Sequence, residues 1–170
     1  MMHPGSSTAA SKPVPALQRL LIAVLPVIAV SLAGGLITRP SIPSWYASLA
    51  KPGFTPPNWL FAPVWTLLYA LMAYALWRVL SLPRNTPGRR AAIGAFFVQL
   101  ALNSLWSFAF FGAQSPLAGL IVIAALNLAI LATMSAFWRL DRAAALLLLP
   151  YLAWVAYATA LNGAIWQLNG

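Results

Sequence analysis

Residues 45–74 read WYASLAKPGFTPPNWLFAPVWTLLYALMAY, a proline-rich aromatic segment that leads into a long apolar run. The Lys51-Pro52 and Pro56-Pro57 steps stiffen its first half, because each proline fixes its own φ and disfavours α geometry in the residue before it. Beyond Trp59 the first charged residue is Arg78. We therefore expect a stiff loop over residues 39–58, suited to cover a flat hydrophobic ligand, and a helix over residues 59–80.

The composition of the chain is that of a membrane protein. Of its 170 residues, 62% are hydrophobic and 6% are charged, whereas a soluble domain has about 25% charged residues. A spanning helix needs about 20 apolar residues. Continuous apolar runs favour helices, because the strands of a membrane barrel alternate apolar and polar residues.

The apolar runs predict the fold class, an all-α membrane protein that forms a five-transmembrane-helix bundle. One domain, residues 17–170, would follow a disordered tail at residues 1–16. The expected helices are residues 17–38, 59–80, 91–112, 117–138 and 143–168. A cleaved signal peptide is the alternative for the first run, but that run is longer than a typical apolar signal core and no clear A-x-A site follows it.

The charges give an orientation and exclude several kinds of site. The net charge is +9, with Asp141 the single acidic residue and no cysteine. Carboxylate pairs, acidic cation sites and thiolate chemistry are therefore excluded, and we expect no metal site, no cofactor and no nucleic-acid partner. Asp141 is expected to cap the fifth helix. Basic residues favour the cytoplasmic side of a membrane.

Ten basic residues divide unequally between the two sides of the expected bundle. Two of them, Arg39 and Lys51, fall on the side of the aromatic loop. The other eight fall on the side of the N-terminus: Lys12, Arg19, Arg78, Arg84, Arg89, Arg90, Arg139 and Arg142. This bias predicts a cytoplasmic N-terminus if the protein lies in a bacterial inner membrane.

Few polar or aromatic residues inside the spans are candidates for a binding site. Asn103 is the best polar candidate, because Trp106 follows it on the same helical face. Trp65 and Tyr69 share a face of the second helix. On the fifth helix, Trp154, Ala158 and Leu161 form one stripe, where the small alanine leaves space beside a large ring. An apolar pocket with few polar anchors is typical of small-molecule sites.

Three stretches of this chain closely resemble signature stretches of the TspO/translocator protein family, also called tryptophan-rich sensory protein or peripheral-type benzodiazepine receptor. They are KPGFTPPNWLFAPVWTLLYALMAY at 51–74, LALNSLWSFAFFGA at 100–113 and PYLAWVAYATALN at 150–162. The resemblance implies a five-helix bundle, often dimeric, that binds porphyrins, cholesterol-like lipids and benzodiazepine-site drugs. The residues that it implies for the ligand pocket are Tyr46, Pro56, Trp65, Tyr69, Asn103, Trp106, Trp154, Ala158 and Leu161.

The sequence departs from the family pattern at the end of the fifth helix. Animal members carry a cholesterol motif there, whose tyrosine and basic residue are replaced in this chain by Gly163 and Gln167. Such motifs are weak patterns, and the departure puts strong cholesterol binding in doubt.

Three functional hypotheses follow. The first is a multi-pass membrane receptor or carrier for porphyrin-type ligands, surrounded by membrane lipids and assembled as a homodimer. Arg39 and Lys51 would then meet the porphyrin carboxylates. The second is an enzyme that degrades porphyrin in light, with Trp65 and Trp154 as the catalytic candidates. The third is a structural or regulatory membrane protein whose pocket is incidental.

Overall fold

The computed structural model describes residues 15–170, so nearly all of the expected tail lies outside the described residues. Its helices are α1 (Ala16–Ser41), α2 (Asn58–Leu80), α3 (Arg89–Ser107), α4 (Pro116–Trp138), α5 (Arg142–Leu146) and α6 (Leu149–Asn169), with π-helical turns η1 (Ile42–Tyr46) and η2 (Phe108–Gly112). Five helical stretches are long and apolar enough to cross a membrane. The predicted five-helix, all-α membrane fold is confirmed.

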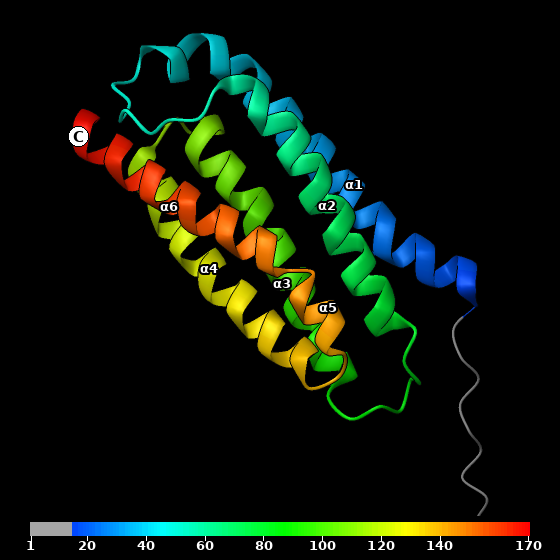
Figure 1. Ribbon diagram of the computed structural model, residues 1–170. Coiled ribbons are helices and arrows are strands. Elements are labelled where there is room, and N and C mark those ends of the chain that lie inside the picture. Colours follow the sequence, from blue (N-terminus) through cyan, green and yellow to red (C-terminus); the bar gives the residue numbers. More distant parts are fainter. Residues whose placement is uncertain (1–14) are drawn as a thin grey trace, which may run out of the picture.

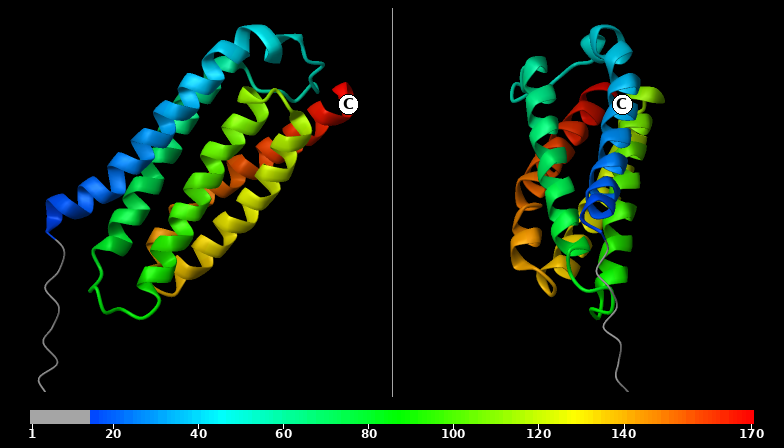
Figure 2. Two further views of the ribbon diagram at one scale, coloured as in Figure 1. Left: turned by 180° about the vertical axis from the view of Figure 1, so that it is seen from behind. Right: turned by 90° about the vertical axis from the view of Figure 1, so that its right-hand side faces the viewer.

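The five spans form one bundle (Figure 1). Helix α4 packs against α3 and α6, while α1 packs against α2 and α3. Seen from behind, α1 diverges from the bundle toward its N-terminal end (Figure 2, left). The loop between η1 and α2 lies at the opposite end, close to the C-terminus (Figure 1). The core between the helices holds fully buried rings, including Phe96 stacked on Phe137 with centroids 6.2 Å apart.

The first span is longer than expected, and much of the expected loop at residues 39–58 is helical. Helix α1 continues through Pro40 and the turn η1, and the non-helical connection begins at about Leu49. The Ser41 hydroxyl donates a hydrogen bond of 2.9 Å to the Phe111 carbonyl of η2. This contact between distant segments, together with the Lys51 contacts described below, stabilises helical geometry where the prolines alone predicted a loop.

The fifth span is broken, whereas the sequence predicted one helix over residues 143–168. Helix α5 ends at Leu146, and α6 begins at Leu149 with Pro150 in its first turn. Proline has no N–H to donate, and its ring clashes with the carbonyl four residues earlier, here that of Leu146. The break therefore falls where a continuous helix would be strained, and Pro150 occupies a position that suits it.

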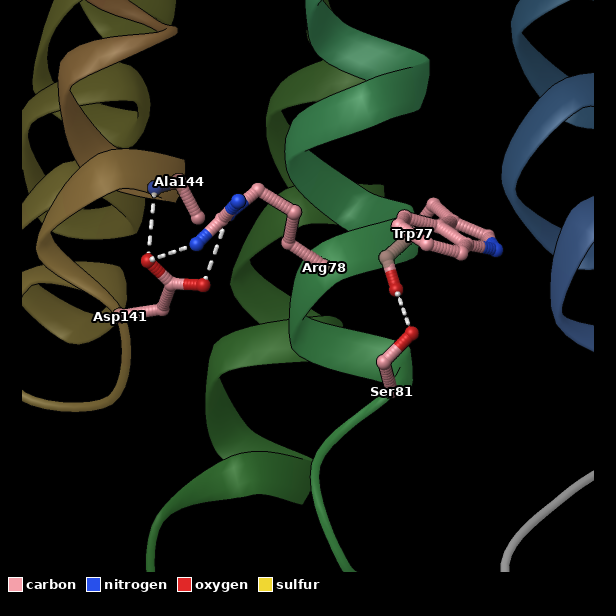
Figure 3. A network of polar contacts seen from close by, with 5 residues as sticks. All are labelled: Trp77, Arg78, Ser81, Asp141 and Ala144. Carbon is pink, nitrogen blue, oxygen red and sulfur yellow. Dashed lines mark hydrogen bonds and ion pairs between the residues drawn. The ribbon is translucent and has the colours of Figure 1, made fainter.

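The one acidic residue caps α5, as predicted. The Asp141 carboxylate accepts a hydrogen bond of 3.1 Å from the Ala144 N–H and one of 2.8 Å from the Arg78 guanidinium, so it connects α5 to the last turn of α2 (Figure 3). Burial raises the pKa of the Asp141 carboxyl, but the hydrogen bonds from Arg78 and Ala144 outweigh this effect and leave the pKa below its usual value. The carboxylate is therefore held in its charged form.

Candidate functional site

A cavity of about 430 Å³ lies among α1, α2, α3 and the two π-helical turns. Its volume is within the range of about 300–1,000 Å³ typical of small-molecule sites. The wall contributed by α2 and α3 is largely aromatic, while the α1 wall is made of two glycines and small side chains, apart from Arg39. The lining residues are Ser31, Gly34, Gly35, Thr38, Arg39, Ile42, Tyr46, Asn58, Phe61, Ala62, Trp65, Thr66, Tyr69, Trp106, Ser107 and Phe111.

The aromatic wall combines rings from distant parts of the chain. The Trp65 and Tyr69 rings of α2 lie 5.3 Å apart between centroids, tilted by 31°. On the other side, the Tyr46 ring lies 5.7 Å from that of Phe111, and Trp106 lies 5.9 Å from Phe111. The faces of such rings attract flat π-systems and cations. The wall is therefore suited to a flat, largely apolar ligand.

Buried amides hold two of these rings in place. The Tyr69 hydroxyl donates a hydrogen bond of 2.9 Å to the Asn103 side-chain oxygen, and the Asn103 NH₂ donates one of 3.2 Å to the Tyr151 hydroxyl. The Trp106 indole N–H donates to the Asn162 side-chain oxygen at 3.3 Å. Asn103 is 1% exposed and lies outside the cavity lining. In the structure it positions Tyr69 from behind, rather than facing the cavity as the sequence analysis expected.

The cavity has one cationic residue and one buried polar atom without a protein partner. Arg39 lines the cavity and is exposed. Tyr46 is 3% exposed, and its hydroxyl has no hydrogen-bond partner among residues 15–170. A buried polar atom without a partner is costly in an apolar setting. The Tyr46 hydroxyl is therefore available to a ligand or a water molecule in the cavity.

Lys51 has a different role from the one expected for it. Its ammonium group donates hydrogen bonds to the carbonyls of Tyr46, Ala47 and Leu49, at 2.7, 3.2 and 2.8 Å. It also lies 5.0 Å from the centroid of the Tyr46 ring. A lysine at a helix C-terminus commonly satisfies the last free carbonyls in this way. Lys51 thus caps the extended first helix, and Arg39 is the cation left to face the cavity.

Of the nine residues implied by the resemblance, four line the cavity: Tyr46, Trp65, Tyr69 and Trp106. Pro56, Trp154, Ala158 and Leu161 do not line it, and neither does Asn103. Trp154 reaches the cavity wall through Phe61, with ring centroids 6.0 Å apart, while Ala158 packs against the core and Leu161 is buried. The reason is that α6 packs mainly against α4 and only marginally against α2.

Several cavity residues were missed by the sequence analysis. Phe61 could have been found, because it precedes Trp65 by one helical turn and shares its face. The α1 residues gave little signal apart from the pair Gly34 and Gly35, since small residues let transmembrane helices approach each other closely. A Cβ at Gly34 would lie 3.5 Å from the Ser107 hydroxyl oxygen of α3, so this glycine does sit at a close α1–α3 contact.

The comparison with known proteins identifies the family. The sequence matches the TspO/MBR family over residues 22–167. The chain belongs to the TspO/MBR family. It is therefore an integral, multi-pass membrane protein of this family, in agreement with its five spans.

Relatives of this TspO/MBR protein come from archaea, bacteria and animals. It is 47% identical to the tryptophan-rich protein TspO of Archaeoglobus fulgidus over 151 residues, which cover 89% of this chain and 97% of the relative. It is 48% identical to the TspO of Chlorobaculum tepidum over 143 residues, 84% and 90% of the two chains. It is 40% identical to the human translocator protein over 128 residues, 74% and 75% of the two chains.

Proposed function

We propose that this protein is a membrane receptor or carrier that binds a porphyrin-type ligand in the cavity among α1, α2 and α3. The observation that carries the proposal is the aromatic wall formed by Tyr46, Trp65, Tyr69 and Trp106 around a cavity of about 430 Å³. Rings in this arrangement can stack on a flat macrocycle, and apolar burial supplies most of the affinity. Membership of a family that includes a tryptophan-rich sensory protein supports a sensing or carrier role.

Arg39 supplies the chemistry for the acidic groups of such a ligand. A porphyrin carries carboxylates at one edge, so the macrocycle can enter the apolar cavity while those groups stay near the exposed guanidinium of Arg39. Arginine suits this role because its planar donors match a carboxylate. The unpartnered Tyr46 hydroxyl offers a second polar contact inside the cavity.

Titration of the purified protein with protoporphyrin, followed by the porphyrin absorption band, tests the proposal. We expect micromolar affinity, about −8 kcal/mol. Trp65→Leu should weaken binding at least fivefold, because it removes a ring from the cavity wall, whereas Trp166→Leu at the exposed end of α6 should not. Equal affinity in parent and Trp65→Leu would refute this site.

The carboxylate contact can be tested separately with the neutral dimethyl ester of protoporphyrin. Arg39→Gln should lower the affinity for the diacid about two- to fivefold, as for an exposed ion pair. The affinity for the ester should stay unchanged. Arg90→Gln, exposed in the first turn of α3 at the other end of the bundle, is the matched control. Equal losses for diacid and ester would show that Arg39 does not contact the carboxylates.

The geometry favours a binding protein over the light-dependent enzyme. Trp65 lines the cavity, but Trp154 contacts it only through Phe61. Chemistry that requires both indoles against one ligand would need α6 to rotate or Phe61 to move. Mass analysis of bound porphyrin after illumination distinguishes the two functions, since a receptor returns the ligand intact.

The orientation in the membrane is also part of the proposal. The connections at the Arg84 and Arg139 end would face the cytoplasm, and the loop over residues 49–57 would face the other side. The chain has no cysteine, so a single cysteine at Arg84 can be labelled selectively in intact cells. Labelling by a membrane-impermeant reagent before lysis would contradict this orientation.

A further inference from the structure

A second hollow lies outside the candidate cavity, on the membrane-facing side of the bundle between α1 and α2. This α1–α2 groove has a volume of about 650 Å³. Its walls are mostly apolar, and the polar groups among them belong to serine, threonine, tyrosine and tryptophan side chains. The lining residues are Leu20, Val24, Val27, Ile28, Ser31, Leu32, Thr66, Tyr69, Ala70, Ala73, Tyr74 and Trp77. The divergence of α1 from the bundle toward its N-terminal end accounts for this hollow (Figure 2).

The length and position of the groove match one leaflet of a bilayer. At 1.5 Å per residue, the α1 wall from Leu20 to Leu32 is about 18 Å long, and the α2 wall from Thr66 to Trp77 is about 17 Å long. Half of a hydrocarbon core of about 30 Å is about 15 Å. The groove runs from the middle of α2 to its last turns, so it faces the leaflet on the side of the arginine-rich connections.

The end of the groove has an aromatic and cationic boundary. The Tyr74 and Trp77 rings are stacked, with centroids 5.9 Å apart, and the Trp77 indole extends from α2 toward α1 (Figure 3). The Arg78 guanidinium lies 5.9 Å from the centroid of the Tyr74 ring, but it is paired with Asp141 and points away from Trp77 (Figure 3). Arg19 precedes Leu20 in α1, and its buried Nε has no hydrogen-bond partner among residues 15–170. Tryptophan, tyrosine and arginine at this depth are the residues that contact lipid headgroups.

We propose that the α1–α2 groove is a binding site for one acyl chain of an anionic glycerophospholipid from the leaflet on the arginine-rich side. The chain lies along the apolar walls, and the phosphate lies at the Arg19 and Trp77 end. A lipid fits better than a second copy of the protein, because the groove has the length of one leaflet and its α1 wall begins directly after the cationic Arg19. Ser31, Thr66 and Tyr69 line both the groove and the candidate cavity, so the end of the chain lies against the cavity wall.

Native mass spectrometry of the purified protein tests this proposal with two probe lipids of identical chains, dioleoyl phosphatidylglycerol and dioleoyl phosphatidylcholine. We expect retention of one phosphatidylglycerol per protein chain, in preference to phosphatidylcholine. Ala70→Phe places a ring in the middle of the groove at an exposed position and should weaken retention of both lipids roughly 5- to 150-fold. Ala160→Phe, exposed on α6 and outside both hollows, is the matched control and should retain lipid like the parent.

A separate variant tests the contact between the lipid headgroup and Arg19. Arg19→Gln should lower phosphatidylglycerol retention about fivefold while leaving phosphatidylcholine unchanged, and Arg90→Gln should not. Porphyrin affinity should be unaffected by Ala70→Phe, because Ala70 does not line the candidate cavity. Unchanged lipid retention in Ala70→Phe, or a loss of dimer in that variant without a loss of lipid, would overturn the proposal.

Discussion

Asn103 holds two phenols that would otherwise be buried without partners. It accepts from the Tyr69 hydroxyl on the cavity side and donates to the Tyr151 hydroxyl on the core side. Interhelical hydrogen bonds in membranes average about 0.6 kcal/mol each. We therefore expect Asn103→Ala to lower stability by about 1 kcal/mol and to weaken porphyrin binding, because Tyr69 is released.

Thermal unfolding in detergent, together with porphyrin titration, measures both effects of Asn103→Ala. Asn127→Ala is the control, since Asn127 bonds to Thr159 between α4 and α6 and does not contact the cavity. It should lower stability without changing porphyrin affinity. If the two variants behave alike in the titration, Asn103 does not position the cavity wall.

Among the elements, α4 lies close to side chains of α6 and η2 at Gly119. A Cβ there would lie 2.8 Å from the Asn162 side-chain oxygen and 2.9 Å from the Phe110 ring. Overpacking of this kind costs about 1–3 kcal/mol, so Gly119→Ala should lower the unfolding temperature. Gly94→Ala is the matched control in α3, where no atom lies within 4 Å of the added Cβ. It should be neutral or stabilising, since alanine favours helix by up to about 1 kcal/mol.

The junction of α2 with α5 should make stability depend on pH. The pKa of Asp141 is lowered in the folded protein. Its contribution to stability is therefore present above the pKa of the unfolded chain, about 3.9, and is lost as the pH falls through the lower pKa of the folded protein. Unfolding midpoints between pH 6 and pH 2 should therefore fall more steeply in the parent than in Asp141→Asn. Parallel pH profiles would contradict this assignment.

Two variants separate the ion pair of Asp141 from its capping role. Asp141→Asn removes the charge but retains a good N-cap. It should therefore lower the free energy of unfolding only by the contribution of the ion pair with Arg78, about 0.2–1 kcal/mol. Asp141→Ala removes both contacts and should cost about 1 kcal/mol more. Equal midpoints for the two variants would show that the cap to Ala144 contributes little.

The loop over residues 49–57 is fastened to α6 at two points. The Tyr157 hydroxyl donates a hydrogen bond of 2.6 Å to the Phe54 carbonyl, and the Asn169 side chain pairs with both backbone groups of Ala50, at 2.9 Å each. We expect Tyr157→Phe combined with Asn169→Ala to increase amide hydrogen exchange in this loop. The amides of α3 serve as an internal control, and exchange that rises equally in α3 would indicate general destabilisation instead.

At the scale of the whole molecule, the outer faces of α3 and α4 carry exposed small residues, among them Ala91, Ala125 and Ala132. Small residues let transmembrane helices approach each other closely, so we expect a homodimer of the 18.2 kDa chain. Ala125→Trp should shift the mass in lipid discs toward the monomer, whereas Ala156→Trp on α6 should not. A monomeric parent in both mild detergent and lipid discs would contradict this prediction.

The sequence by itself determined the number of spans, their approximate positions and the capping role of Asp141. Both are local properties, because a run of about 20 apolar residues suffices to cross a bilayer and an N-cap acts within one helical turn. The same locality let it predict that Trp65 and Tyr69 share a face. The family motifs at 51–74, 100–113 and 150–162 could also be recognised in the sequence, and the match to the family over residues 22–167 confirms them.

Only the tertiary structure decided which faces of the helices meet. In a soluble helix the apolar stripe shows the buried side, but these spans are apolar on nearly all sides, so the sequence could not show that α6 turns Trp154 toward Phe61 and away from the cavity. Nor could it show the partners of Asn103 and Lys51, or the Ser41–Phe111 bond that accompanies the extension of the first helix. Each depends on contacts between residues far apart in the chain, or on a backbone geometry that proline patterns do not predict.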